Sequence, residues 1–382
     1  MAELAIAPES ITAQPSHSFA IEAALLILRL RGVATDIPPE IDWLAFQRLA
    51  EENGVLLPAH RELMKIGAQM PASFQLAVSA QRAAAEGMAA ELEALLKVFQ
   101  EHGIDVLPLK GPALALALYG NATMRQANDL DLLVRRGDFA IAETLLVGLG
   151  FAGLGAAGDH DRRFVRGELL VELHFELASP RFFPFDIDGI WNRSHASDFR
   201  GIPVCAMSGN DRVFYLCAHG LKHGFSRLVW ILDVAQALRG MTDGDYRELV
   251  RQAQSQGLLA WLLTGCEVVR VMFPEQLPEG MDAATSRFSM ALKRARRAAQ
   301  RLFSEKPEQE AFDYRTLYLQ AEANPVRRCL YRMRYLAPTQ SDEFWAREHH
   351  IHPRLMFLLR PFRLLEKFGP ARVWRILFPS GI

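Results

Sequence analysis

The chain has 382 residues, of which half are hydrophobic, and a formal net charge of −1. Its mean hydropathy is +0.03. These values are typical of an ordinary globular protein and exclude wholesale disorder, and the length suffices for two or three cores. Without a strong overall charge, nucleic acid is not expected as a partner, although that alternative stays open.

The cysteines and the N-terminus favour a cytoplasmic protein. No CxxC pair occurs, so neither a zinc knuckle nor a disulfide framework is predicted for the four cysteines, Cys205, Cys217, Cys266 and Cys329. The N-terminal MAELAIAPES lacks a basic segment followed by an apolar stretch, so we do not expect secretion. No uncharged apolar run reaches the roughly 18 residues of a membrane-spanning helix.

The first part of the chain, residues 1–102, is predicted to be an N-terminal helical region. Helical periodicity runs over Ile21–Arg31, Ile41–Asn53 and Phe74–Glu101.

Residues 103–207 are predicted to form the catalytic domain, because short strand patterns alternate with helices there. The predicted elements are a strand at 104–109, a helix starting at Pro112 and stopping near Gly120, a strand at 129–134, a helix at 138–149, and a hairpin of 162–165 and 169–177 with its turn at Gly167. This β-α-β-α-β-β order indicates a small mixed sheet packed on helices. The fold class is therefore α+β.

Residues 208–304 are predicted to form a helical substrate domain. Its first helix has Ser208 or Asn210 as N-cap, and further helices are expected at 228–238, 246–256, 258–272 and 283–303.

Residues 305–382 are predicted to be a linker, at 305–310, and a basic C-terminal helical tail. From Val326 onward the tail has 11 Lys and Arg residues against four Asp and Glu residues, which would suit a phosphate-rich partner or membrane headgroups. The segment PRLMFLLRPFRLLEKF has two interpretations: a membrane-surface helix, or a helix packed on the body with its arginines outward and interrupted at Pro361. We prefer the second.

Paired carboxylates are the strongest chemical signal in the sequence. Residues two apart on a strand point the same way, so Asp129 and Asp131 of DLDLLV share a face while Leu130 and Leu132 enter the core. Two such acids repel unless a divalent cation neutralises them, and Mg²⁺ takes carboxylate oxygens while leaving positions for phosphates. In VELHFEL the same rule puts Glu172, His174 and Glu176 on one face, where Glu172 would be a third carboxylate.

Three residues upstream of these acids suit phosphate. Lys110 and Gly111 stand where a strand meets a helix, so backbone amides, a close approach and a positive charge would coincide. Arg125 offers a forked donor just before the acids. Three acids holding metal ions beside a phosphate site predict phosphoryl or nucleotidyl transfer.

The strings LKG, LYGN, NDLDLLV, VELHFEL and HGLKHGFSRLVWILDVA closely resemble a bacterial uncharacterised nucleotidyltransferase family related to polymerase β and aminoglycoside nucleotidyltransferases. The resemblance implies a polymerase-β-like domain with a DxD metal pair at Asp129 and Asp131 and a third acid at Glu172. It implies Mg²⁺, with Mn²⁺ as the alternative, and an NTP as co-substrate.

The resemblance also implies a cleft between domains, lined by His219, Lys222, His223 and Asp233. HGLKH lacks the glutamate of HExxH, so a zinc protease is not predicted, and helix packing is the alternative role of its two histidines. His174 is either a site residue or a hydrogen-bonded structural histidine.

We therefore expect transfer of a nucleotidyl group from an NTP to a hydroxyl or phosphate of a small molecule or peptide, with release of pyrophosphate. Some relatives accompany biosynthetic clusters of lasso-type peptides, so peptide modification is one form of this function. Pro112 in the phosphate loop and Glu172 in place of aspartate depart from the wider superfamily. One alternative is therefore an inactive nucleotide- or peptide-binding homologue, and another is a toxin-like enzyme that modifies RNA or protein.

Overall fold

The computed structural model describes two stretches of the chain. The first is residues 20–274 apart from 34, 156–157, 159, 179 and 181–184, and the second is residues 325–374 apart from 339, 353–354 and 371–372; Leu277 is described as well. The predicted helix at 283–303 and the predicted linker at 305–310 lie outside the described residues. Of the described helices, none combines the length and the apolar character needed to cross a membrane.

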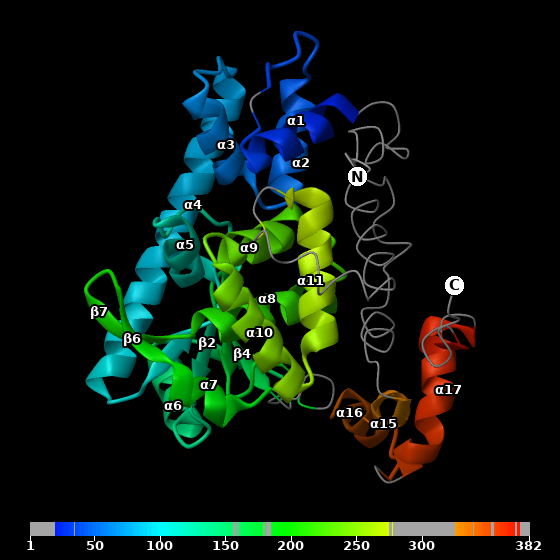
Figure 1. Ribbon diagram of the computed structural model, residues 1–382. Coiled ribbons are helices and arrows are strands. Elements are labelled where there is room, and N and C mark those ends of the chain that lie inside the picture. Colours follow the sequence, from blue (N-terminus) through cyan, green and yellow to red (C-terminus); the bar gives the residue numbers. More distant parts are fainter. Residues whose placement is uncertain are drawn as a thin grey trace.

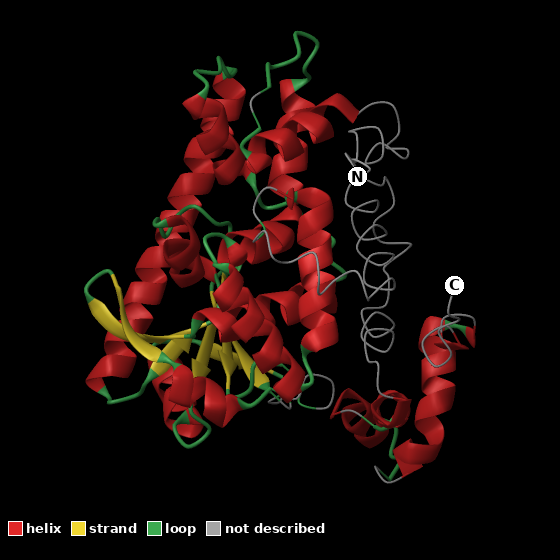
Figure 2. Ribbon diagram, viewed as in Figure 1, coloured by secondary structure: helices red, strands yellow, loops and turns green. Residues whose placement is uncertain are grey.

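Helices dominate the described part of the chain (Figure 2). They are α1 (Ala20–Arg31), α2 (Trp43–Glu52), α3 (Leu56–Lys65), α4 (Ala72–Glu101), α5 (Gly111–Tyr119), α6 (Phe139–Gly148), α7 (Ile187–Arg193), α8 (Gly209–Lys222), α9 (Leu228–Leu238), α10 (Asp243–Gln256), α11 (Leu259–Met272), α15 (Pro325–Leu336), α16 (Gln340–Glu348) and α17 (Met356–Phe368). The predicted helices that fall on described residues before the tail are confirmed, and α3 and α7 were not predicted. Ser208 is the N-cap of α8, where its hydroxyl accepts a hydrogen bond from the Asp211 backbone N–H.

The strands form a five-stranded mixed sheet and a separate hairpin. They are β1 (Val106–Pro108), β2 (Asp129–Val134), β3 (Ala152–Leu154), β4 (Asp161–Arg166), β5 (Leu169–His174), β6 (His195–Phe199) and β7 (Ile202–Ala206). The sheet order is β1-β2-β5-β4-β3, in which only the β2–β5 pair is parallel. The predicted hairpin is confirmed, with Gly167 in its turn at a φ of 59°. The structure adds β3 and the β6–β7 hairpin, and the mixed α+β class is confirmed.

Two hydrophobic clusters cover the two faces of the sheet. Leu132 belongs to a cluster with the second half of α4 and with α6, whereas its neighbour Leu133 belongs to a cluster with α1–α3 and α8–α11. This alternation is the period of two that a strand buried on both faces requires.

Helix α4 joins the two clusters. At about 1.5 Å per residue its 30 residues extend roughly 45 Å, from the N-terminal helices to the far side of the sheet (Figure 1). The N-terminal helices and α8–α11 share one hydrophobic core. The division into four domains at residues 102, 207 and 304 stays a prediction.

The tail differs from the expected helix with outward arginines. Helix α17 continues through Pro361. Arg360 is buried and forms an ion pair with Asp342 of α16, which Arg363 also contacts at 2.7 Å. Several apolar side chains of this segment are exposed instead, namely Leu355, Phe357, Leu358, Phe362 and Leu365. The predicted outward orientation of the arginines was wrong for Arg360. Its partner Asp342 lies on another helix, so the local sequence pattern does not reveal that the arginine is neutralised.

The crossing of α8 and α11 is tight enough to test. A methyl group at Gly265 of α11 would overlap the Cys217 sulfur of α8, whereas Gly87 on the exposed face of α4 has open space around it. We expect Gly265→Ala to lower the free energy of unfolding by about 1–3 kcal/mol through overpacking. The control Gly87→Ala should raise it by about 0.5–1 kcal/mol through helix propensity. Denaturant unfolding of both variants measures this, and an unchanged stability for Gly265→Ala would contradict the packing.

Candidate active site

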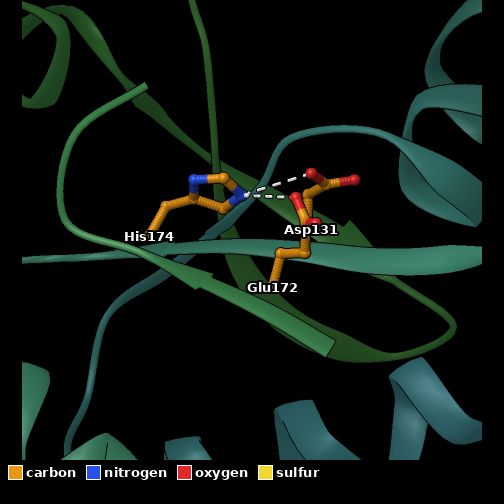
Figure 3. Close-up of side chains that lie close together, drawn as sticks. All are labelled: Asp131, Glu172 and His174. Carbon is orange, nitrogen blue, oxygen red and sulfur yellow. Dashed lines mark hydrogen bonds and ion pairs between the residues drawn. The ribbon is translucent and has the colours of Figure 1, made fainter. Parts of the chain in front are cut away.

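The acidic residues meet because β2 and β5 run parallel in a fixed register. Asp131 lies opposite Glu172, and Leu133 lies opposite His174. Asp129, Asp131, Glu172 and His174 all project from the face toward α8 and α9, because the residues between them enter the cluster on the other face. Figure 3 shows Asp131, Glu172 and His174 pointing toward one another. The predicted same-face geometry of Asp129 with Asp131 and of Glu172 with His174 is therefore present. The expectation that Glu176 shares this face was wrong, because β5 ends at His174 and the alternation does not continue: Leu177 lines the cavity instead.

Lys110 reaches this cluster from the end of β1. Its Nζ lies 2.9 Å from Asp131 Oδ1, and both side chains are nearly buried. The following residue, Gly111, begins α5 with a φ of 62°, in the left-handed region that side chains other than glycine's avoid. Gly111 thus lets the chain turn sharply from strand to helix while the lysine enters the site.

The three carboxylates have unequal protonation behaviour. Burial, and next the charge of Asp131, raise the pKa of Asp129, and the same two causes raise the pKa of Glu172. Burial would also raise the pKa of Asp131, but Lys110 and a hydrogen bond from His174 outweigh it and hold that pKa well below its usual range. Asp131 is therefore the fixed negative charge of the site, whereas a bound cation would favour the ionised forms of Asp129 and Glu172.

A cavity of about 250 Å³ lies over this face of the sheet. Of the residues predicted for the site, it is lined by Lys110, Arg125, Asp129, Asp131, Glu172, His174, His219, Lys222 and His223. Gly111 and Asp233 do not line it. The predicted set is thus brought together from β1, β2, β5, α8 and the loop before β2.

Arg125 is held by an acid rather than left open for phosphate. Its Nε donates to Asp233 Oδ2 at 2.8 Å, and both side chains are buried. The Tyr119 hydroxyl donates to the other oxygen of Asp233 at 3.3 Å. The role of Asp233, predicted as cleft lining, is to hold Arg125 at the cavity wall from α9.

The part of the cavity formed by α8 and α9 is aromatic and also carries cations. The rings of His219 and His223 lie 4.7 Å apart between centroids, and Trp230 of α9 lies 4.7 Å from His223. Burial, and then nearby lysines or the second histidine, lower the pKa of both histidines, so their rings are neutral at pH 7. Lys222 also lines the cavity and has no ion-pair partner among the residues the structure describes.

The sequence analysis missed several lining residues, including Tyr215, Arg227 and Trp230. Tyr215 could have been found, because it stands four residues before His219 and shares its helical face. Arg227 and Trp230 follow α8 without such a spacing signal.

Comparison with known proteins identifies the family. Residues 39–274, more than half of the chain, match the profile of a family described as uncharacterised nucleotidyltransferase. The chain belongs to the uncharacterised nucleotidyltransferase family.

One solved structure, of an antigenic nucleotidyltransferase-like protein from Paracoccidioides brasiliensis, is similar with 19% identity and a TM-score of 0.33. That alignment covers 50% of this chain and 93% of the other. No curated protein matches this nucleotidyltransferase-family chain.

The chemistry of the donor set suits a divalent cation. Asp131, Glu172 and His174 each offer one ligand atom, and these atoms lie within 4.8 Å of one another. Asp131 Oδ2 is buried and has no hydrogen-bond partner in the described part of the chain. A buried carboxylate oxygen without a donor is unfavourable, and a cation would satisfy it.

The Lys110–Asp131 ion pair predicts that neutralising Asp131 destabilises the protein much more than neutralising Asp129, two residues earlier on β2. Asp131→Asn leaves the buried Lys110 ammonium without its counter-charge, which should cost about 3–5 kcal/mol of unfolding free energy. Asp129→Asn is the matched control, because Asp129 has no ion pair among the described residues. Urea unfolding without added metal measures both. Equal effects of the two substitutions would show that the ion pair contributes nothing.

The raised pKa of Asp129 predicts a pH effect with a defined sign. The unfolded chain loses this proton at a lower pH than the folded chain does, so the metal-free protein loses stability as pH rises through the window above the usual carboxyl pKa. Asp129→Asn removes this loss. With EDTA present, we expect the variant to melt above the wild type at pH 7, and the difference to shrink toward about pH 4. A melting temperature at pH 7 that is higher for the wild type than for Asp129→Asn would contradict this prediction.

Proposed function

We propose that this chain transfers a nucleotidyl group from an NTP to a hydroxyl or phosphate of a small-molecule or peptide acceptor, with Mg²⁺ or Mn²⁺ as cofactor and pyrophosphate as product. The observation that supports this most is the single cavity in which carboxylates of two adjacent parallel strands face cationic side chains. Family membership supports a transferase of this general class.

In the proposed reaction the acceptor oxygen forms a bond to the α-phosphorus, and the bond from that phosphorus to the bridging oxygen breaks. Asp131 and Glu172 would hold the cation, which when bound neutralises phosphate oxygens and polarises the acceptor hydroxyl. Asp129 is placed to receive the hydroxyl proton, because its half-buried carboxylate lines the cavity and has no ion pair among the described residues. Pyrophosphate leaves with the electron pair of the broken bond.

The contacts of Lys110 and Arg125 suggest phosphate-binding roles that differ from those expected from the sequence. Lys110 is engaged by Asp131 and Arg125 by Asp233, so each presents its charge from a fixed position. Lys222 has no ion-pair partner among the described residues, so its long flexible side chain is the one that we assign to the leaving pyrophosphate. The aromatic rings of His219, His223 and Trp230 would receive the acceptor or the base.

The proposal is tested with purified protein, each of the four labelled NTPs, Mg²⁺ or Mn²⁺, and candidate acceptors or cell extract. We expect metal-dependent pyrophosphate release and a species heavier by one nucleotide in mass spectrometry. Asp129→Asn should reduce the rate by about 100-fold or more, the range expected when a group acting in the transition state is lost.

Glu176→Gln is the matched control, because Glu176 belongs to the same VELHFEL segment but pairs with the exposed Arg136 outside the cavity. Its rate should equal that of the wild type. Full turnover by Asp129→Asn would reject the role of the acids. Metal-dependent NTP binding without any product would identify an inactive homologue instead.

A further inference from the structure

His174 occupies a position that a purely carboxylate metal site would not need. Its Nε2 lies 3.2 Å from Asp131 Oδ1 and 3.7 Å from Glu172 Oε2 (Figure 3). The ring is buried at 5% exposure, so it is held in this direction rather than sampling the cavity. One imidazole nitrogen and two carboxylates therefore converge on a common point.

The strand register explains why this trio forms and why Asp129 is outside it. Along the parallel pair, the facing residues Asp131 and Glu172 are in the middle, Asp129 is two residues toward the start of β2, and His174 is two residues toward the end of β5. The ligand atoms of Asp131, Glu172 and His174 come within 4.8 Å of one another, and Asp129 is not part of that group. The three potential ligands that lie closest together are thus Asp131, Glu172 and His174, and not the pair of Asp129 and Asp131.

A second, independent observation points to a ligand at this cluster. Asp131 Oδ1 already accepts from Lys110 and His174, while Oδ2 of the same buried carboxylate has no hydrogen-bond partner among the described residues. A charged oxygen out of water without a donor carries an uncompensated desolvation cost. A cation bound by the Asp131 carboxylate would offset that cost, because its charge acts on both oxygens.

We propose that His174 Nε2 is a metal ligand together with Asp131 and Glu172, and that the site therefore prefers a divalent transition-metal ion, Mn²⁺ among them, to Mg²⁺. Mg²⁺ binds through carboxylates, water and phosphate oxygens and gains little from imidazole, whereas transition metals accept nitrogen and oxygen together. The inference rests on the proposed function only in placing a cation in this cavity. It assigns His174 a role beyond helping to orient Asp131.

The test is pulsed electron paramagnetic resonance of the full chain titrated with Mn²⁺ alone. We expect echo modulation from a directly coordinated nitrogen, which changes when the histidines are labelled with ¹⁵N. His174→Gln should abolish this modulation. His160→Gln should retain it, because the His160 ring neighbours that of His174 at 6.2 Å but is not part of the donor trio.

Calorimetric titration gives the second readout. Mn²⁺ should bind the wild type more tightly than Mg²⁺, and His174→Gln should weaken Mn²⁺ binding at least about tenfold, the lower end of what loss of even a supporting residue costs. Mg²⁺ affinity should change little.

Bound Mn²⁺ without nitrogen modulation in the wild type would overturn the proposal, as would modulation that persists in His174→Gln or an absence of Mn²⁺ binding. These results do not depend on catalysis. Nitrogen coordination without pyrophosphate release would reject the proposed transferase function and leave the metal assignment standing.

Discussion

The parallel pairing of β2 with β5 is the constraint on which the rest of the site depends. It sets Asp131 opposite Glu172 and directs both toward the cavity, while Leu132 and Leu173 fill the core on the other face. A slip of one residue in either strand would exchange these faces and bury charges among α4 and α6. The apolar residues on the far face therefore fix the geometry of the acids, although none of them lines the cavity.

Two buried ion pairs tie other elements to this arrangement. Lys110, from the turn between β1 and α5, is bound to Asp131, and Arg125, from the loop before β2, is bound to Asp233 of α9. Because an isolated buried charge is costly, each pair holds its segment in place more firmly than an exposed pair would. They also leave the site with cations whose positions are set before any nucleotide binds, so that less ordering is needed on binding.

Much of the fold and part of the site could be predicted from local patterns. The period of two in DLDLLV, and in VELHFEL as far as His174, predicts which side chains share the site face, and the glycine at 167 predicts the hairpin, because both signals are confined to a few residues. The parallel register of β2 and β5 could not be derived, since some 40 residues and two other strands separate them.

Long-range partners account for the remaining differences. Arg125 and Asp233 are 108 residues apart, so no local pattern shows that the arginine is neutralised. The same holds for the tail, where Asp342 draws Arg360 inward. Helix α3 was missed because it contains Pro58, which the first turn of a helix tolerates. The β6–β7 hairpin was missed because strands of five residues carry little periodicity.

The central claim is that side chains of adjacent parallel strands form a divalent-cation site that also receives a triphosphate. The most direct measurement is anomalous diffraction from crystals grown with Mn²⁺ and a non-hydrolysable NTP. The account predicts a manganese peak within coordination distance of Asp131 and Glu172, with phosphate oxygens on its cavity side. A fully bound nucleotide elsewhere, with no manganese at these carboxylates, would contradict it.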